Sequence, residues 1–96
     1  REIDGREFQI AGHTDNLAIR TRQFPDNWAL STARAVTVAR HMIGQGVPPN
    51  RISAAGHADT QPVASNDDEA GRALNRRIEI VLLPNLDELP DLTSLE

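Results

Sequence analysis

Two short apolar segments, each ending in a glycine, flank one long amphipathic segment, and this order constrains the fold more than any other feature. Residues 7–12 and 51–56 alternate apolar and polar side chains, which is typical of short strands. Between them, residues 27–43 carry small or apolar side chains on one helical face, and the glycines and prolines of residues 44–49 end that helix. A strand–helix–strand unit predicts parallel pairing with a right-handed crossover, so both strands should end at the same edge of a sheet.

A shorter helix and a third strand complete the predicted order of strand, helix, strand, helix and strand. Asn66 is expected to cap the second helix, because Glu69 follows three residues later in a capping-box pattern. Residues 77–83 place apolar side chains at every second position and predict the third strand, which Pro84 ends. Ninety-six residues are enough for one such core but not for two.

The charges divide the chain into a neutral body and an acidic tail. All ten basic residues are arginines, and residues 1–84 hold ten of the fourteen acidic residues, so this part has no net charge. Residues 85–96 hold the other four acids and no base, and they account for the whole net charge of -4. We predict a domain over residues 1–84 and an acidic tail with proline and spaced leucines over residues 85–96. The absence of a basic cluster argues against nucleic-acid binding.

The sequence also excludes several functional classes. No apolar run approaches the roughly 18 residues of a membrane span, so membrane attachment is expected only through segments absent from this chain. Cysteine is absent, which removes thiol catalysis and cysteine-ligated zinc. The chain has no nucleophile elbow, P-loop or dinucleotide-binding glycine pattern. We therefore predict a domain that is not an enzyme and needs no cofactor.

A carboxylate and a guanidinium are predicted to flank one shallow pocket. Asp15 follows the first strand, and Arg34 lies about two turns into the long helix, where its side chain leans back toward the helix start. On the residues alone, two interpretations are open. The two groups can pair with each other, or they can stand apart and bind a zwitterion, with Asp15 taking an ammonium and Arg34 a carboxylate.

A repeated stretch offers a possible metal site at the same edge. AGHTD at residues 11–15 recurs as AGHAD at residues 55–59, and both copies follow a strand. Each glycine can simply allow a tight exit from its strand, with the polar side chains bonding to loop backbone. If the loops converge, two imidazoles and two carboxylates would suit a divalent ion. The residues of this alternative site are His13, Asp15, His57 and Asp59.

Two adjacent arginines lie at the junction of the second helix and the third strand. Arg76 and Arg77 should point in different directions, so that one can face the pocket while the other pairs with a carboxylate. The alternative is that both belong to a solvated charge cluster.

Four stretches, taken together, resemble the OmpA-like peptidoglycan-binding domain. This domain is shared by outer-membrane OmpA proteins, peptidoglycan-associated lipoproteins and MotB-type flagellar stator anchors. The resemblance rests on GHTDN at 12–16, NWALSTARAVTV at 27–38, RISAAG at 51–56 and GRALNRRIEI at 71–80. The approach FPDNW at residues 24–28 resembles the MotB-type branch more than OmpA itself.

The resemblance implies what the pocket binds. In such domains the aspartate of the GHTD loop and the arginine of the LSxxRA stretch bind the diaminopimelate of the peptidoglycan stem peptide, and these positions are Asp15 and Arg34 here. Diaminopimelate offers an ammonium and a carboxylate on one free carbon, which agrees with the zwitterion interpretation. The other residues of the implied binding set are Thr14, Asn27, Leu30, Asn75, Arg76 and Arg77.

The resemblance also implies an α+β fold with a mixed sheet covered by helices. The first strand and helix of the family domain are missing from this chain, so apolar sheet surface should be exposed and a homodimer is expected. The full-length protein is expected in the periplasm of a Gram-negative bacterium, tethered to a membrane and anchoring an envelope protein or machine to the cell wall. An interaction module that uses the acidic tail is the remaining alternative. His57 departs from the family, which commonly has an aromatic residue there.

Overall fold

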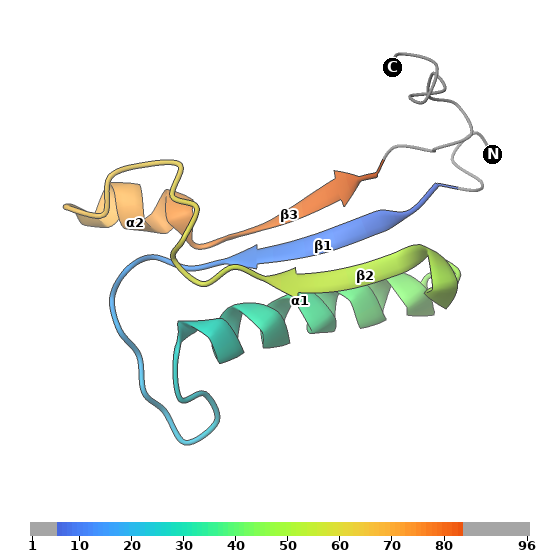
Figure 1. Cartoon of the computed structure of the whole chain (residues 1–96), viewed down its shortest axis with the longest axis horizontal. Coiled ribbons are helices and arrows are strands. Elements are labelled where there is room, and N and C mark those ends of the chain that lie inside the picture. The colour runs from blue at the N-terminus through green and yellow to red at the C-terminus, as the bar shows by residue number, and fades with distance from the viewer. Residues whose placement is uncertain (1–5, 84–96) are drawn as a thin grey trace, which may run out of the picture.

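The structure, a computed structural model, describes residues 6–83 and shows a three-stranded sheet with two helices (Figure 1). The elements in chain order are β1 (Phe8–His13), α1 (Asn27–Gly44), a 3-10 turn (Pro49–Arg51), β2 (Ile52–Gly56), α2 (Glu69–Asn75) and β3 (Arg77–Leu82). The strand order is β2-β1-β3, with β1 parallel to β2 and antiparallel to β3. The predicted α+β class with a mixed sheet is confirmed.

α1 begins and ends where its sequence indicates. The Asp26 carboxylate accepts a hydrogen bond of 2.9 Å from the Ala29 backbone N–H and caps the helix start. At the other end, the Gln45 N–H bonds to carbonyls of the last turn, and the prolines that follow cannot continue a helix. The predicted span of residues 27–43 is confirmed to within one residue.

α1 packs on one face of β1 and β2 (Figure 1). Ile10 from β1 and Ala35 and Ala39 from α1 form the buried core between the two layers. Because alanines face the sheet, the helix backbone can approach the strands closely. The core is therefore small, and it extends from Ile10 and Ala54 toward Ile52 at the start of β2.

Two glycines bring the start of α1 against the ends of the parallel strands. A Cβ on Gly12 would overlap the backbone of Ser31, and a Cβ on Gly56 would overlap Thr32 of the same helix. The Ser31 hydroxyl, with no solvent exposure, accepts a hydrogen bond of 3.0 Å from the Ala58 N–H just after β2. These contacts fix the first turns of α1 relative to the loops that follow β1 and β2.

β3 places its apolar side chains on the same side of the sheet as α1 but outside the area that α1 covers. Ile80 is paired in register with the buried Ile10, and yet Ile80 is 59% exposed. Ile78 and Leu82 are exposed as well. Within residues 6–83, the expected exposure of apolar sheet surface is confirmed.

The predicted cap of α2 is wrong. Asp68, not Asn66, caps this helix, because its carboxylate accepts a hydrogen bond of 2.8 Å from the Gly71 N–H. The Asn66 side-chain oxygen instead accepts a hydrogen bond from the Asn75 amide at 2.9 Å. Glu69 becomes the first helical residue, and its carboxylate is directed at side chains rather than at the backbone.

Some expectations fall on residues 1–5 and 84–96, which lie outside the described residues. The acidic tail over residues 85–96, the domain boundary before it and the interaction module based on it stay predictions. Among residues 6–83, no helix combines the length and the apolar character that crossing a bilayer requires.

The close packing of α1 predicts a large difference between two glycine substitutions. Gly12→Ala should lower the free energy of unfolding by about 1–3 kcal/mol, because its methyl group overlaps backbone that cannot move alone. Gly44→Ala at the C-terminal end of α1 is the control, since an added Cβ there meets nothing within 4 Å. Urea denaturation of both variants measures the difference, and equal stabilities would contradict the packing described.

Candidate ligand-binding site

Asp15 lies in the loop directly after β1 and is 7% exposed. The loop is tied to the end of β2, because the Thr14 N–H donates a 2.9 Å hydrogen bond to the Ala58 carbonyl. One carboxylate oxygen of Asp15, Oδ1, accepts a hydrogen bond of 3.0 Å from the Leu17 N–H. The backbone therefore holds this carboxylate in one orientation and satisfies one of its two oxygens.

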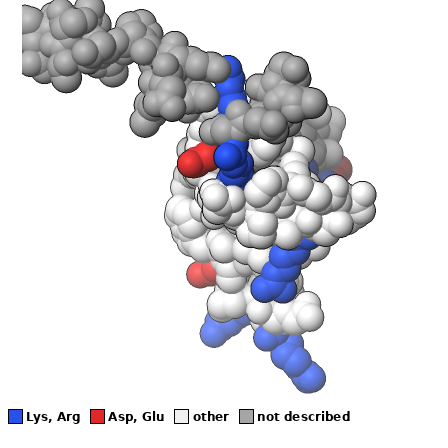
Figure 2. Space-filling model, turned by 90° about the vertical axis from the view of Figure 1, so that its right-hand side faces the viewer, with Lys and Arg blue, Asp and Glu red and all other residues white. Residues whose placement is uncertain are grey.

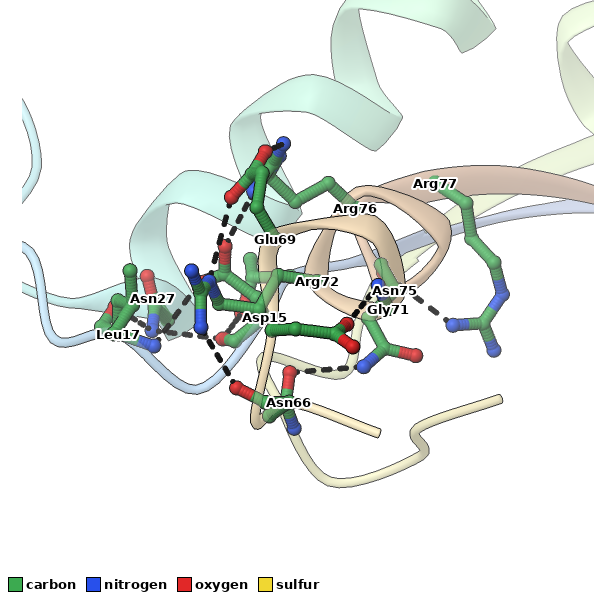
Figure 3. A network of polar contacts seen from close by, with 12 residues as sticks. Asp15, Leu17, Asn27, Asn66, Glu69, Gly71, Arg72, Asn75, Arg76 and Arg77 are labelled. Atoms are coloured by element: carbon green, nitrogen blue, oxygen red, sulfur yellow. Dashed lines mark hydrogen bonds and ion pairs between the residues drawn. The ribbon is translucent and has the colours of Figure 1, made fainter. Parts of the chain in front are cut away.

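Asn27, the first residue of α1, joins this loop to the helix. Its Nδ2 donates to the Leu17 carbonyl at 3.1 Å and lies 3.4 Å from the Asp15 carbonyl (Figure 3). The Asn27 amide thus acts mainly as a clamp that sets where Asp15 lies relative to the start of α1. Its side-chain oxygen accepts no hydrogen bond from the described residues.

The ion-pair partner of Asp15 is Arg76, 61 residues away in sequence. Arg76 Nη1 donates to Asp15 Oδ2 at 2.8 Å, and Arg76 Nη2 donates to Glu69 Oε2 at 2.5 Å (Figure 3). The hydrogen bonds to Glu69 and Asp15 raise the pKa of Arg76 further above its usual range. The same contact with Arg76 lowers the pKa of the Glu69 carboxyl.

Arg34 is exposed and, within the described part of the chain, makes no hydrogen bond or ion pair. The direct pairing of Asp15 with Arg34 is therefore not formed. Arg34 lines an open groove of about 490 Å³ between α1 and the start of β3. The other lining residues are Phe24, Leu30, Ala33, Thr37, Val38, Arg76, Arg77 and Ile78. An unengaged guanidinium thus shares a partly apolar groove with the arginine that holds the buried carboxylate.

Asn75 does not belong to the binding surface, which corrects the prediction for this residue. It has no solvent exposure. Its Oδ1 accepts from the N–H groups of Val63 and Ala64 at 2.7 and 3.0 Å, and its Nδ2 donates to Ala64 O and Asn66 Oδ1, both at 2.9 Å. All four hydrogen-bonding positions of the amide are occupied, so Asn75 fixes the loop before α2.

Thr14 is a second residue whose side chain is turned inward. It is 5% exposed, and its hydroxyl donates to the Asp15 carbonyl at 2.7 Å. The side chain predicted to touch the ligand is thus used to shape the loop, and we assign it to positioning Asp15.

The adjacent arginines point in different directions, as predicted. Arg77 donates from Nε to Glu79 Oε2 at 2.6 Å and from Nη2 to the Gln61 carbonyl at 3.0 Å. Figure 3 shows its side chain turned away from the Asp15–Arg76 pair. Both arginines are paired with carboxylates, and Arg77 serves mainly to join β3 to the loop after β2.

On the face that Figure 2 shows, the basic side chains of the described residues do not merge into one area. On the described part of the end that Figure 2 shows, basic side chains stand at separate places with uncharged surface between them. This face therefore lacks the continuous basic stripe that would track a nucleic-acid backbone.

The two histidines of the repeat meet, but not as metal ligands. The His13 and His57 rings stack with centroids 4.9 Å apart and planes 15° apart, so their nitrogens do not converge on one point. Asp15 is engaged by Arg76, and Asp59 is exposed. Within residues 6–83, no group of three or more His, Asp or Glu side chains is placed to hold a metal ion. The arrangement of the described residues therefore gives the alternative metal site no support.

Glu69 is the residue of this site that the sequence interpretation missed. The capping-box pattern predicts that its side chain bonds to the backbone at the helix start. The spacing of seven residues between Glu69 and Arg76 indicates a different role, because it places both side chains on one face across two turns of helix. Their contact in the structure follows this spacing.

The buried His13 predicts how stability depends on pH. Burial and then the Arg77 guanidinium lower the pKa of His13 below its ordinary value of 6.5, against a weaker opposing effect of Glu79. The unfolded chain therefore binds a proton more readily than the folded one as the pH falls below about 6.5, so the free energy of unfolding should decrease there. NMR titration of the His13 ring should give a midpoint below 6.5, and a midpoint above this value would contradict the argument.

Known proteins share this fold and much of this sequence. The chain is 41% identical to Motility protein B of Bacillus subtilis (strain 168) over 80 residues, which are 82% of this chain and 31% of that protein. It is 44% identical to the cell wall anchor of the T6SS from Pseudomonas aeruginosa, with a TM-score of 0.74 and coverage of 78% of this chain and 52% of that one. The periplasmic domain of Helicobacter pylori MotB gives a TM-score of 0.81 at 28% identity. The match covers 96% of this chain and 57% of that one.

The chain thus spans about a third of that Motility protein B and about half of those two solved chains. The profile of the OmpA family matches residues 1–76, which are most of the chain and include the loops and helices that build the site. The family match thus covers every described element before β3, and the chain belongs to the OmpA family.

Proposed function

We propose that this domain binds peptidoglycan without catalysis, by holding the zwitterionic end of diaminopimelate in the stem peptide between Asp15 and Arg34. The observation that carries the proposal is the state of these two groups. Arg34 lines the groove with no partner among the described residues, and Asp15 is buried with only one oxygen satisfied by backbone. A free guanidinium binds a carboxylate with two parallel hydrogen bonds, and the Asp15 carboxylate suits an ammonium.

The apolar part of the groove fits the rest of such a ligand. Leu30, Val38 and Ile78 lie along the groove beside Arg34, where they can contact the methylene chain of diaminopimelate. Asn27 and Thr14 hold the Asp15 loop in place. The arrangement therefore selects a ligand that carries both charges at the end of a short aliphatic chain.

The relatives support a role at the cell wall. One similar solved structure is described as the cell wall anchor of the T6SS, and another similar protein is the Peptidoglycan-associated lipoprotein of Pseudomonas aeruginosa. By this similarity we propose that the domain anchors a larger envelope protein, as a MotB-type anchor does. A periplasmic location agrees with Helicobacter pylori MotB, whereas the Bacillus subtilis relatives leave the restriction to Gram-negative bacteria unsupported. The homodimer stays a prediction.

Loss of either charged group should strongly weaken binding to cell walls. Asp15→Asn keeps the shape and the Leu17 hydrogen bond but removes the charge, and Arg34→Ala removes the free guanidinium. Each should weaken co-sedimentation with purified sacculi by about tenfold or more, because each leaves one ligand charge unpaired. Arg40→Ala, an exposed arginine of α1 outside the groove, is the control. Retained binding by both site variants, with native circular dichroism, would refute the assignment.

The chemistry of the ligand gives a sharper test. A stem peptide with lysine in place of diaminopimelate keeps the ammonium and lacks the carboxylate, so the wild-type domain should bind it more weakly. Arg34→Ala should bind the two peptides about equally, because the group that distinguishes them is gone. Calorimetric titration with both peptides measures this, and a preference that survives in Arg34→Ala would place the carboxylate elsewhere.

A further inference from the structure

The carboxylate proposed to take the ligand ammonium already has a cation on it. Asp15 Oδ1 is used by the Leu17 N–H, so Oδ2 is the oxygen left for a ligand, and Arg76 Nη1 occupies it at 2.8 Å. The Asp15 side chain is 10% exposed, whereas that of Arg76 is 37% exposed. A ligand ammonium that binds this oxygen must share it with Arg76 or displace that guanidinium.

Arg76 has a second carboxylate available. Its Nη2 donates to Glu69 Oε2 at 2.5 Å, and Glu69 is 64% exposed in its side chain (Figure 3). Glu69 and Arg76 lie on one face of α2 and its C-terminal end, so they can stay in contact whatever happens at Asp15. Arg72 approaches Glu69 as well, at 3.4 Å from its Nε, but its Nη1 is bound to the Asn66 carbonyl at 2.9 Å.

We propose that Arg76 is an internal competitor for the ligand-binding oxygen of Asp15, and that Glu69 is the positioning residue that keeps Arg76 paired when the ligand ammonium takes this oxygen. This inference rests on the proposed function of the same site. With Glu69 present, ligand binding moves Arg76 from two carboxylates to one. Without Glu69, the same event leaves Arg76 with no carboxylate partner. Displacing Arg76 from Asp15 then costs more free energy, and the ligand binds more weakly.

The proposal separates Arg76 from the residues that touch the ligand. If Arg76 bound the ligand carboxylate as Arg34 does, its removal would weaken binding. If Arg76 competes for Asp15, its removal frees Oδ2 and leaves binding unchanged or stronger. The role of Glu69 then depends on Arg76 and disappears when Arg76 is gone, which a double-mutant cycle detects.

The experiment compares four proteins of a double-mutant cycle and one control variant. Calorimetry measures the affinity of each for a synthetic stem peptide that ends in diaminopimelate, at low and high salt. Glu69→Gln should bind about two- to fivefold more weakly than wild type at low ionic strength, the range typical of one partly exposed ion pair, and the loss should shrink with salt. Arg76→Gln should bind at least as well as wild type. Glu69→Gln combined with Arg76→Gln should match Arg76→Gln alone.

Asp67→Asn is the matched control, because it removes one negative charge from the same segment without touching Arg76. Among the described residues, the side chain of Asp67 makes no hydrogen bond, and its backbone N–H donates to the Ser65 hydroxyl. It should bind like wild type. Equal affinity of Glu69→Gln and wild type, or weaker binding by Arg76→Gln, would overturn the inference while leaving the Asp15–Arg34 site intact. Failure of the wild-type domain to bind the peptide would instead overturn the proposed function and this inference with it.

Discussion

The contact of α1 with the ends of the parallel strands is the constraint on which the site depends. Gly12 and Gly56 have no side chain where the first turns of the helix cross them, so Ser31 and Thr32 lie directly against the sheet. This contact sets the position of the helix start relative to the loops after β1 and β2. The loop that carries Asp15 and the helix that carries Arg34 therefore have a fixed relation that neither element could produce alone.

A second property of the site is that its carboxylate is occupied before any ligand arrives. Pairing Asp15 with Arg76 compensates a buried negative charge that would otherwise be costly. The pairing also means that affinity depends on a balance between an internal and an external cation, and not only on the number of ligand contacts. Arg34 differs in this respect, because its guanidinium is exposed to solvent and has no partner among the described residues.

Local patterns in the sequence predicted the elements well, because their causes are local. The alternation of residues 77–82, the helical face of residues 27–43 and the proline stop after α1 each act within a few residues. The partners of polar side chains are set by tertiary contacts and were predicted poorly. Nothing within a few residues of Asp15 indicates that it pairs with Arg76, and nothing near Asn75 shows that its amide is buried. The resemblance identified which polar residues matter, and only the structure separated those that face the groove from those that support it.

The four hydrogen bonds of the Asn75 amide determine which residues are held together on one side of the Asp15–Arg76 ion pair. Because it binds residues 63–66 to the end of α2, this loop, Glu69 and Arg76 are joined into one supported block. Asp15 belongs to a different block, held by α1 and the strand ends. The ion pair between Asp15 and Arg76 joins these two groups of hydrogen bonds, and separating the pair leaves the hydrogen bonds within each group intact.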